Sequence, residues 1–217
     1  MRTCETGRQR RPLTATARSR VIVGVLLVAC ARPVRAQDEC RRHGFWFGLG
    51  LGYGSAHVAC DTCSSGPRLG GWDLSFDLGA TPSPHVGLGV GGFGWLHGWK
   101  GDRLPAIDTW TVSLSYYPRI HGGPFVEAGV GLSHYMLAKG TGDPLESISN
   151  GTSPAAGTGV GYTLGVGWEV NGGSLTPRVT YAYGSVGTLH ASDGATVATG
   201  WRQNLLLVEL GFRGGLP

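Results

Sequence analysis

The sequence has no apolar run long enough to cross a membrane as a helix. Such a helix needs about 20 consecutive apolar residues, and the one clear apolar run, at residues 21–29, is far shorter. Any role in a membrane must therefore use β-strands or a lipid anchor.

That short run belongs to a pattern typical of a secretory signal peptide. Six arginines lie within residues 1–20, and Val34-Arg35-Ala36 places small residues where a signal peptidase cuts. We expect residues 1–36 to be removed by cleavage after about Ala36. A second possibility is cleavage before Cys30 and lipidation of that residue, because Leu27-Val28-Ala29-Cys30 matches a bacterial lipobox.

The exported part of the chain also lacks the positive charge that nucleic-acid binding requires. The whole chain has a formal charge of +4, but eight of its 18 Lys and Arg and one of its 14 Asp and Glu precede Gln37. The remainder has a formal charge of −3, so we expect no nucleic acid among its partners.

Large apolar residues alternate with glycine at the start of the exported chain. Between Gly44 and Gly54 every odd position is large and apolar, and from Gly48 onward every even position is glycine. Because side chains of a strand alternate between its faces, one face is apolar and the other is nearly bare. Lipid outside a barrel and a cramped interior favour both properties.

Alternation recurs in seven further segments, which predicts eight strands. They are residues 44–55, 72–80, 86–95, 109–117, 126–133, 159–170, 178–183 and 205–213. A change of phase at Gly91-Gly92 predicts a β-bulge, and Pro82 and Pro84 predict a short turn. Long connections, among them residues 138–156 and 185–199, alternate with short ones, as is typical of barrels that span a membrane.

We therefore expect an all-β fold, an eight-stranded antiparallel up-and-down transmembrane β-barrel. It would occupy residues 44–213, between a periplasmic lead at 37–43 and a tail at 214–217, with its interior about filled by side chains. A soluble lipocalin-like barrel is the main alternative, since Gly44-Phe45-Trp46 matches the start of that family. The expected outward face, with Trp72, Trp110 and Trp168, is too aromatic for water.

The signal peptide, the eight strands and the aromatic Phe212 near the end of the last strand resemble the small eight-stranded outer-membrane β-barrel proteins of bacteria. The Gly-rich first strand followed by Cys60-Asp61-Thr62-Cys63 is similar to a group of uncharacterised barrels with a CxxC loop. The resemblance covers residues 44–212 and implies an outer-membrane location. It implies outer-membrane lipid and the barrel-assembly machinery as partners, leaves any extracellular partner open, and implies no reaction.

Seven charged side chains are expected to point into the barrel as a polar cluster. They are Asp73, Asp77, Glu127, Glu169, Arg178, Glu209 and Arg213. All but Asp73 fall near the periplasmic ends of their strands, so we expect these six to meet. Buried charges persist when they are paired, which favours an ion-paired plug, and a site for a cation or polar ligand is the alternative.

Cys60 and Cys63 lie in the first outer loop and are expected to form a disulfide in an oxidising compartment. Cys40 lies at the other end of the strand, across an apolar band of about 25 Å. Because a disulfide needs Cα atoms within about 7 Å, we expect Cys40 to pair with neither of them. We expect no metal site, since a structural zinc ion needs four ligands and His57 alone is near.

No set of residues predicts catalysis or a cofactor. Ser133 and His134 are adjacent on a strand and therefore point to opposite faces, and Ser55 and His57 lack a suitably spaced acid. The glycines of residues 87–92 have the letters of a dinucleotide motif without its helix.

We therefore expect a non-enzymatic protein that acts structurally or through its outer loops. A narrow transporter for a small or apolar solute is the second hypothesis, and a lipid-modifying enzyme has less support.

Overall fold

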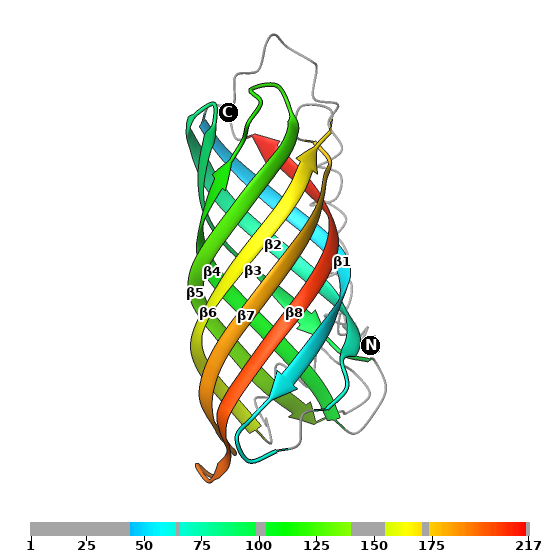
Figure 1. Cartoon of the computed structure of the whole chain (residues 1–217), viewed down its shortest axis with the longest axis vertical. Helices are drawn as coiled ribbons and strands as arrows, with labels where there is room; N and C mark the ends of the chain where they lie inside the picture. The colour runs from blue at the N-terminus through cyan, green and yellow to red at the C-terminus, as the bar shows by residue number, and fades with distance from the viewer. Residues whose placement is uncertain (1–43, 64–65, 99–102, 140–154, 171–173, 216–217) are drawn as a thin grey trace, which may run out of the picture. The chain divides into compact units, whose positions relative to one another are not determined.

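A computed structural model of the chain describes residues 44–63, 66–98, 103–139, 155–170 and 174–215. They form a closed barrel in which each strand pairs antiparallel with its neighbours in sequence and the first strand pairs with the last (Figure 1). The strands are β1 (Gly44–Ala59), β2 (Leu69–Ser83), β3 (Val86–Leu96), β4 (Arg103–Tyr116), β5 (Gly123–Lys139), β6 (Ala155–Glu169), β7 (Thr176–His190) and β8 (Thr196–Gly215). The predicted fold class is confirmed.

Two ends of the barrel can be distinguished by the direction of the strands. At the turn end, β1 begins, β8 ends, and β2 passes to β3 through residues 84–85. At the loop end, β1 passes to β2 and β7 passes to β8. None of the described residues forms a helix of the length and apolarity that crossing a membrane requires.

The strands extend further toward the loop end than the sequence predicted. The expected loop at residues 185–199 is reduced to 191–195, because β7 continues to His190 and β8 begins at Thr196. Gly187 has a φ of 80° and lies where the β7–β8 register shifts. This irregularity breaks the simple alternation, which is why the extension was not visible in the sequence.

The predicted bulge at Gly91-Gly92 is wrong. The register of β3 with both neighbours runs without a break through these two residues. Before these glycines the large residues Leu88 and Val90 face outward, whereas after them Phe93 and Trp95 face inward and are buried. The apolar residues therefore change from the outer to the inner face without a bulge. The register shift lies at the turn end, between Ala80 and Ser83. It leaves Pro82, which lacks an N–H group, out of the ladder with β3, and the expected proline turn shortens to residues 84–85.

The glycines of β1 line the interior, as the alternation predicted. Gly48, Gly50 and Gly52 are buried, while the leucines between them are exposed on the outer wall. A Cβ atom on Gly52 would lie 2.5 Å from Asp73 Oδ1 and 2.8 Å from Glu209 Cγ. These glycines therefore leave space for charged side chains that arrive from other strands.

The outer wall of the barrel is covered with exposed apolar side chains from all eight strands. Representative members are Leu51, Leu74, Val90, Val112, Val130, Leu164, Val179 and Val208. A water-soluble protein rarely exposes a continuous apolar surface of this extent, so the wall is suited to lipid.

Several predictions concern residues outside the described ranges. They are the signal peptide with its cleavage site after Ala36, the lipobox at Cys30, the lead at 37–43 with Cys40, and the end of the tail at 216–217. Most of the expected loop at 138–156 also lies there.

Candidate functional site in the barrel interior

An ion-paired group around Arg178 crosses the barrel interior. Its guanidinium donates two hydrogen bonds to Glu209, at 2.8 Å from Nε to Oε2 and 2.9 Å from Nη2 to Oε1, and a third at 3.0 Å from Nη1 to Asp77 Oδ2. Arg178 and Glu209 are register partners on β7 and β8, whereas Asp77 reaches them from β2. Thr180 Oγ1 adds a hydrogen bond of 3.2 Å to Glu209. The planar guanidinium thus binds one carboxylate with two hydrogen bonds and a second carboxylate with one.

A second charged group, built around Arg213, lies nearer the turn end. Its Nη1 atom is 3.4 Å from Glu169 Oε1 and donates to the hydroxyl of Tyr117. The guanidinium carbon also lies 3.9 Å from the ring centroid of Trp46 and 5.7 Å from that of Phe125. Aromatic faces attract a guanidinium at these distances, so this charge is held by an acid, a phenol and two rings.

Two of the seven predicted residues take no part in these ion pairs. Glu127 accepts a hydrogen bond of 2.8 Å from Ser115 Oγ. Asp73 is 2% exposed, and its carboxyl group lies beside that of Glu209. Five of the predicted cluster residues therefore form two ion-paired groups, and the interior holds more acids than arginines.

The loop end of the interior is filled by apolar side chains instead. A buried cluster combines Trp95 and Ile107, each 1% exposed, with Leu205 and Leu207, both 0% exposed. Ala56, Cys60, Phe93, Tyr135, Ala182, Val186, Leu189 and Ala198 complete it. The nearly bare inner face that the alternation in residues 44–54 predicts does not extend to the other strands in this half, because strand extensions and the reversed faces of β3 supply large residues.

A short polar row runs beside the apolar cluster. Ser133 Oγ lies 3.1 Å from Thr109 Oγ1 and accepts a hydrogen bond of 2.9 Å from Gln203 Nε2. All three side chains are buried. Ser133 is thus engaged within the interior, while His134 faces the outer wall and binds Asp108 at 3.0 Å. The two residues point to opposite faces, so the geometry offers no nucleophile–base pair there.

Small cavities lie along the barrel interior. One of about 10 Å³ and one of about 20 Å³ both border Asp77 and Arg178. A third, of about 40 Å³, borders Trp95 and Tyr135 at the loop end. Because one water molecule needs roughly 10–15 Å³ measured in this way, each of the first two has room for about one water.

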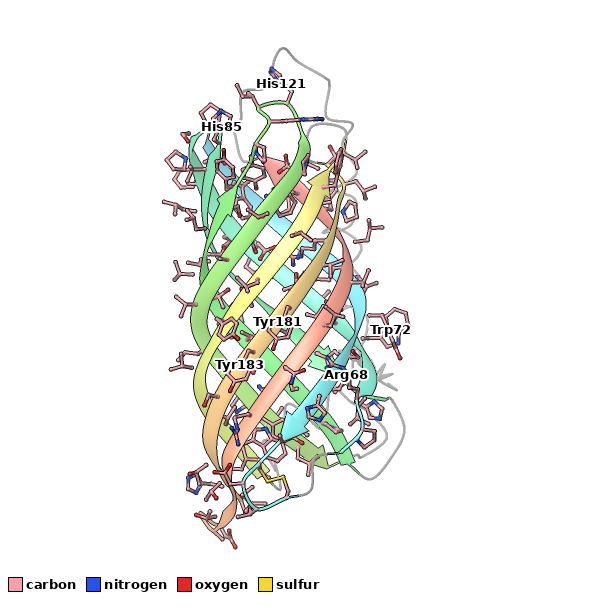
Figure 2. All side chains as sticks on the ribbon, in the orientation of Figure 1. Arg68, Trp72, His85, His121, Tyr181 and Tyr183 are labelled. Atoms are coloured by element: carbon pink, nitrogen blue, oxygen red, sulfur yellow. A yellow bond between two sulfur atoms is a disulfide. The ribbon has the colours of Figure 1, made fainter. Side chains whose placement is uncertain are left out.

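The predicted disulfide between Cys60 and Cys63 is present at the loop end, where the Cα atoms are 5.3 Å apart (Figure 2). Asp61, between the two cysteines, pairs with Arg202 of β8 at 2.8 Å. Its backbone N–H donates to the carbonyl of Thr199 at 3.0 Å. These contacts attach the connection after β1 to the neighbouring strand β8.

The site includes residues that the sequence did not single out. Trp46, Tyr117 and Phe125 surround Arg213, and Thr180 supports Glu209. Tyr117 and Thr180 could have been found from the sequence, because they lie on the inward faces of the strands expected at 109–117 and 178–183. No local pattern indicates that the ring of Trp46 meets the last strand, because that contact depends on closure of the barrel.

Comparison with known proteins agrees with this fold. No protein-family model matches the sequence, and no curated protein matches it significantly. Neisserial surface protein A (NspA) is 13% identical, with 76% of this chain and 96% of that chain covered at a TM-score of 0.51. Ail, the attachment invasion locus protein of Yersinia pestis, is 12% identical, with 79% and 99% covered at a TM-score of 0.51. At such identities the likeness shows the fold, that of the small eight-stranded outer-membrane barrels.

Proposed function

We propose that this protein is a non-conducting barrel of the bacterial outer membrane that acts as a structural scaffold and presents its loop end for surface contact. The observation that carries the proposal is the combination of an apolar outer wall with an interior occupied by side chains at two successive levels. The turn end would face the periplasm, and outer-membrane lipid and the barrel-assembly machinery would be its partners.

The outer wall supports the membrane location. Trp72, Trp110 and Trp168 are exposed on it at 49 to 58%, and such aromatic side chains favour the boundary between lipid and water. The described strands have 11 to 20 residues, while about 9–11 residues suffice to cross the apolar layer. The strands are therefore long enough to span the membrane and to continue beyond it.

The interior supports the absence of conduction. The groups around Arg178 and Arg213 fill the turn-end half, and the apolar cluster fills the loop-end half. An ion that crossed would have to displace buried, charge-assisted hydrogen bonds and then enter an apolar layer. The narrow-transporter hypothesis requires a continuous pathway through the barrel. The interior cavities named above are separate and have volumes of only about 10 to 40 Å³ each.

Single-barrel recordings in planar lipid bilayers test the proposal. The purified full chain should insert and give no steps of ionic current, and a double variant Arg178→Ala with Arg213→Ala, if it still inserts, should remain silent because of the apolar layer. Adding Trp95→Ala to that variant should permit brief openings. Steady current through the unaltered protein would contradict the scaffold and favour the transporter.

A further inference from the structure

Arg68 is held on the outer wall of the barrel by neutral groups. Its Nε donates to Ser55 Oγ at 3.1 Å, its Nη2 to the Ser55 carbonyl at 3.1 Å, and its Nη1 to Asn204 Oδ1 at 3.0 Å. Within the described part of the chain, no carboxylate lies at ion-pair distance from it. A guanidinium has five N–H groups, so two remain available on a side chain that is fixed in place and exposed.

Aromatic side chains flank this arginine along the wall. Tyr53 and Trp72 form an edge-to-face pair at 5.5 Å, and Tyr162 stacks on Tyr183 at 5.3 Å. Trp72, Tyr181 and Tyr183 are placed around Arg68 on the loop-end half in Figure 2. Belts of Tyr and Trp mark the level of lipid headgroups, so the free N–H groups of Arg68 lie where phosphate groups would be.

A shallow, largely apolar groove of about 510 Å³, whose lining also includes Glu127, begins at Leu206 on the outer wall. One border is a continuous row of register partners across five strands, Leu206, Tyr181, Leu164, Ala128 and Leu114. The same row continues through Leu206 to Ser55, the residue that Arg68 binds. Arg68 also lies close enough to Tyr181 for electrostatic interaction.

The shape of the groove fits an extended apolar chain. Its other border is the neighbouring row, which includes Tyr116, Val126, Val166 and Val179. Four spacings between strands, at about 4.8 Å each, give the groove a length of about 19 Å. Ala128 lies between Leu114 and Leu164 in the first row and is smaller than both, so it deepens the groove at that point.

We propose that Arg68 and this groove together bind one phosphorylated lipid, with the phosphate on the guanidinium and an acyl chain along the groove. The inference rests on the proposed membrane location. Arginine binds phosphate oxygens through paired N–H groups, and its neutral partners leave the positive charge uncompensated. The apolar rows then bury the chain next to that phosphate.

Native mass spectrometry of the refolded full chain in nonionic detergent tests this site. Dioleoyl phosphatidic acid, dioleoylglycerol and inorganic phosphate are the probes for the whole lipid, the chains alone and the phosphate alone. We expect phosphatidic acid to bind about tenfold more tightly than dioleoylglycerol, and Arg68→Gln to remove that difference. Ala128→Leu should weaken both lipids by filling the groove.

Arg202→Gln is the matched control, because Arg202 is also exposed at the loop end but is already paired with Asp61. It should leave the preference for phosphatidic acid unchanged, and Arg68→Lys should retain part of it. Equal binding by the Arg68→Gln variant and the unaltered protein would overturn the proposal. Displacement of phosphatidic acid by an equal concentration of inorganic phosphate would also overturn it.

The experiments can contradict the lipid site and the proposed function independently of each other. A barrel that inserts into bilayers without conducting, yet shows no preference for phosphatidic acid, contradicts the lipid site alone. A barrel that conducts steadily while it binds phosphatidic acid contradicts the closed scaffold alone.

Discussion

The two halves of the barrel interior are occupied by side chains that interact in different ways. At the turn end, Arg178 and Arg213 hold three carboxylates through charge-assisted hydrogen bonds. At the loop end, Trp95, Ile107 and their neighbours pack without charges. A charged group depends on each partner being present, because removal of one partner leaves a buried charge. An apolar cluster loses stability in proportion to the contacts removed.

Both halves of the interior need glycines on the inner face, but different side chains occupy the space that these glycines leave. In the turn-end half, the side chains of Asp73, Ser75 and Asp77 project toward Gly52, Gly50 and Gly48 on the neighbouring strand. The charged groups therefore need a strand that is bare on its inner face. In the loop-end half, Gly54 leaves space for Leu207 of the apolar cluster in the same way, so the glycines of β1 serve both halves of the interior.

The largest expected effect comes from filling that bare face. Replacing Gly48, Gly50 and Gly52 together with leucine should prevent folding of the barrel, since even a Cβ on Gly52 meets Asp73 and Glu209. The measurement is the shift in gel mobility on heating that distinguishes folded from unfolded barrels. Gly94→Leu is the control, because a Cβ there meets no atom within 4 Å. A triple variant that folds and resists heat like the unaltered protein would show that the barrel does not need the space left by these glycines.

The next effect tests the charged half. Arg178→Gln leaves Glu209 and Asp77 without their cation and should lower the free energy of unfolding by about 3–5 kcal/mol. Urea unfolding in lipid vesicles, followed by tryptophan fluorescence, measures it. Arg202→Gln breaks an exposed ion pair and should cost less than about 1 kcal/mol. Equal losses for the two variants would show that burial of the Arg178 group contributes nothing.

A smaller loss is expected in the apolar half. Trp95→Ala should lower the free energy of unfolding by about 3 kcal/mol, toward the low end for such truncations, because Trp95 already borders a cavity of about 40 Å³. The same vesicle assay measures it. Trp110→Ala, on the outer wall with its side chain 58% exposed, provides the comparison. A larger loss for Trp110→Ala would mean that lipid contact outweighs interior packing.

The smallest effect has the opposite sign. Asp73→Asn replaces a buried carboxyl group, which lies beside the carboxylate of Glu209, with a neutral amide. It should raise the free energy of unfolding by about 1 kcal/mol. Asp77→Asn, on the same strand and face, should lower it, because Asp77 pairs with Arg178. Destabilisation by Asp73→Asn would show that its charge supports the polar half.

The sequence by itself determined the number of strands, the inward and outward faces of every strand but β3, and the disulfide. These features depend on alternation within one strand or on residues three apart, and side-chain direction along a strand follows from local geometry. The same locality explains the error at Gly91-Gly92, since local alternation does not distinguish a bulge from a regular strand whose faces change character.

Only the tertiary structure decided which charges meet and where the interior becomes apolar. Arg178 and Asp77 are separated by 101 residues, and Arg213 and Tyr117 by 96. Their contacts depend on the register of each strand pair and on closure of β1 against β8, which set the height of every inward side chain. The glycine pattern of residues 44–54 predicted space inside the barrel. The pairing of β1 with β2 and β8 determined that Asp73, Asp77 and Glu209 occupy that space.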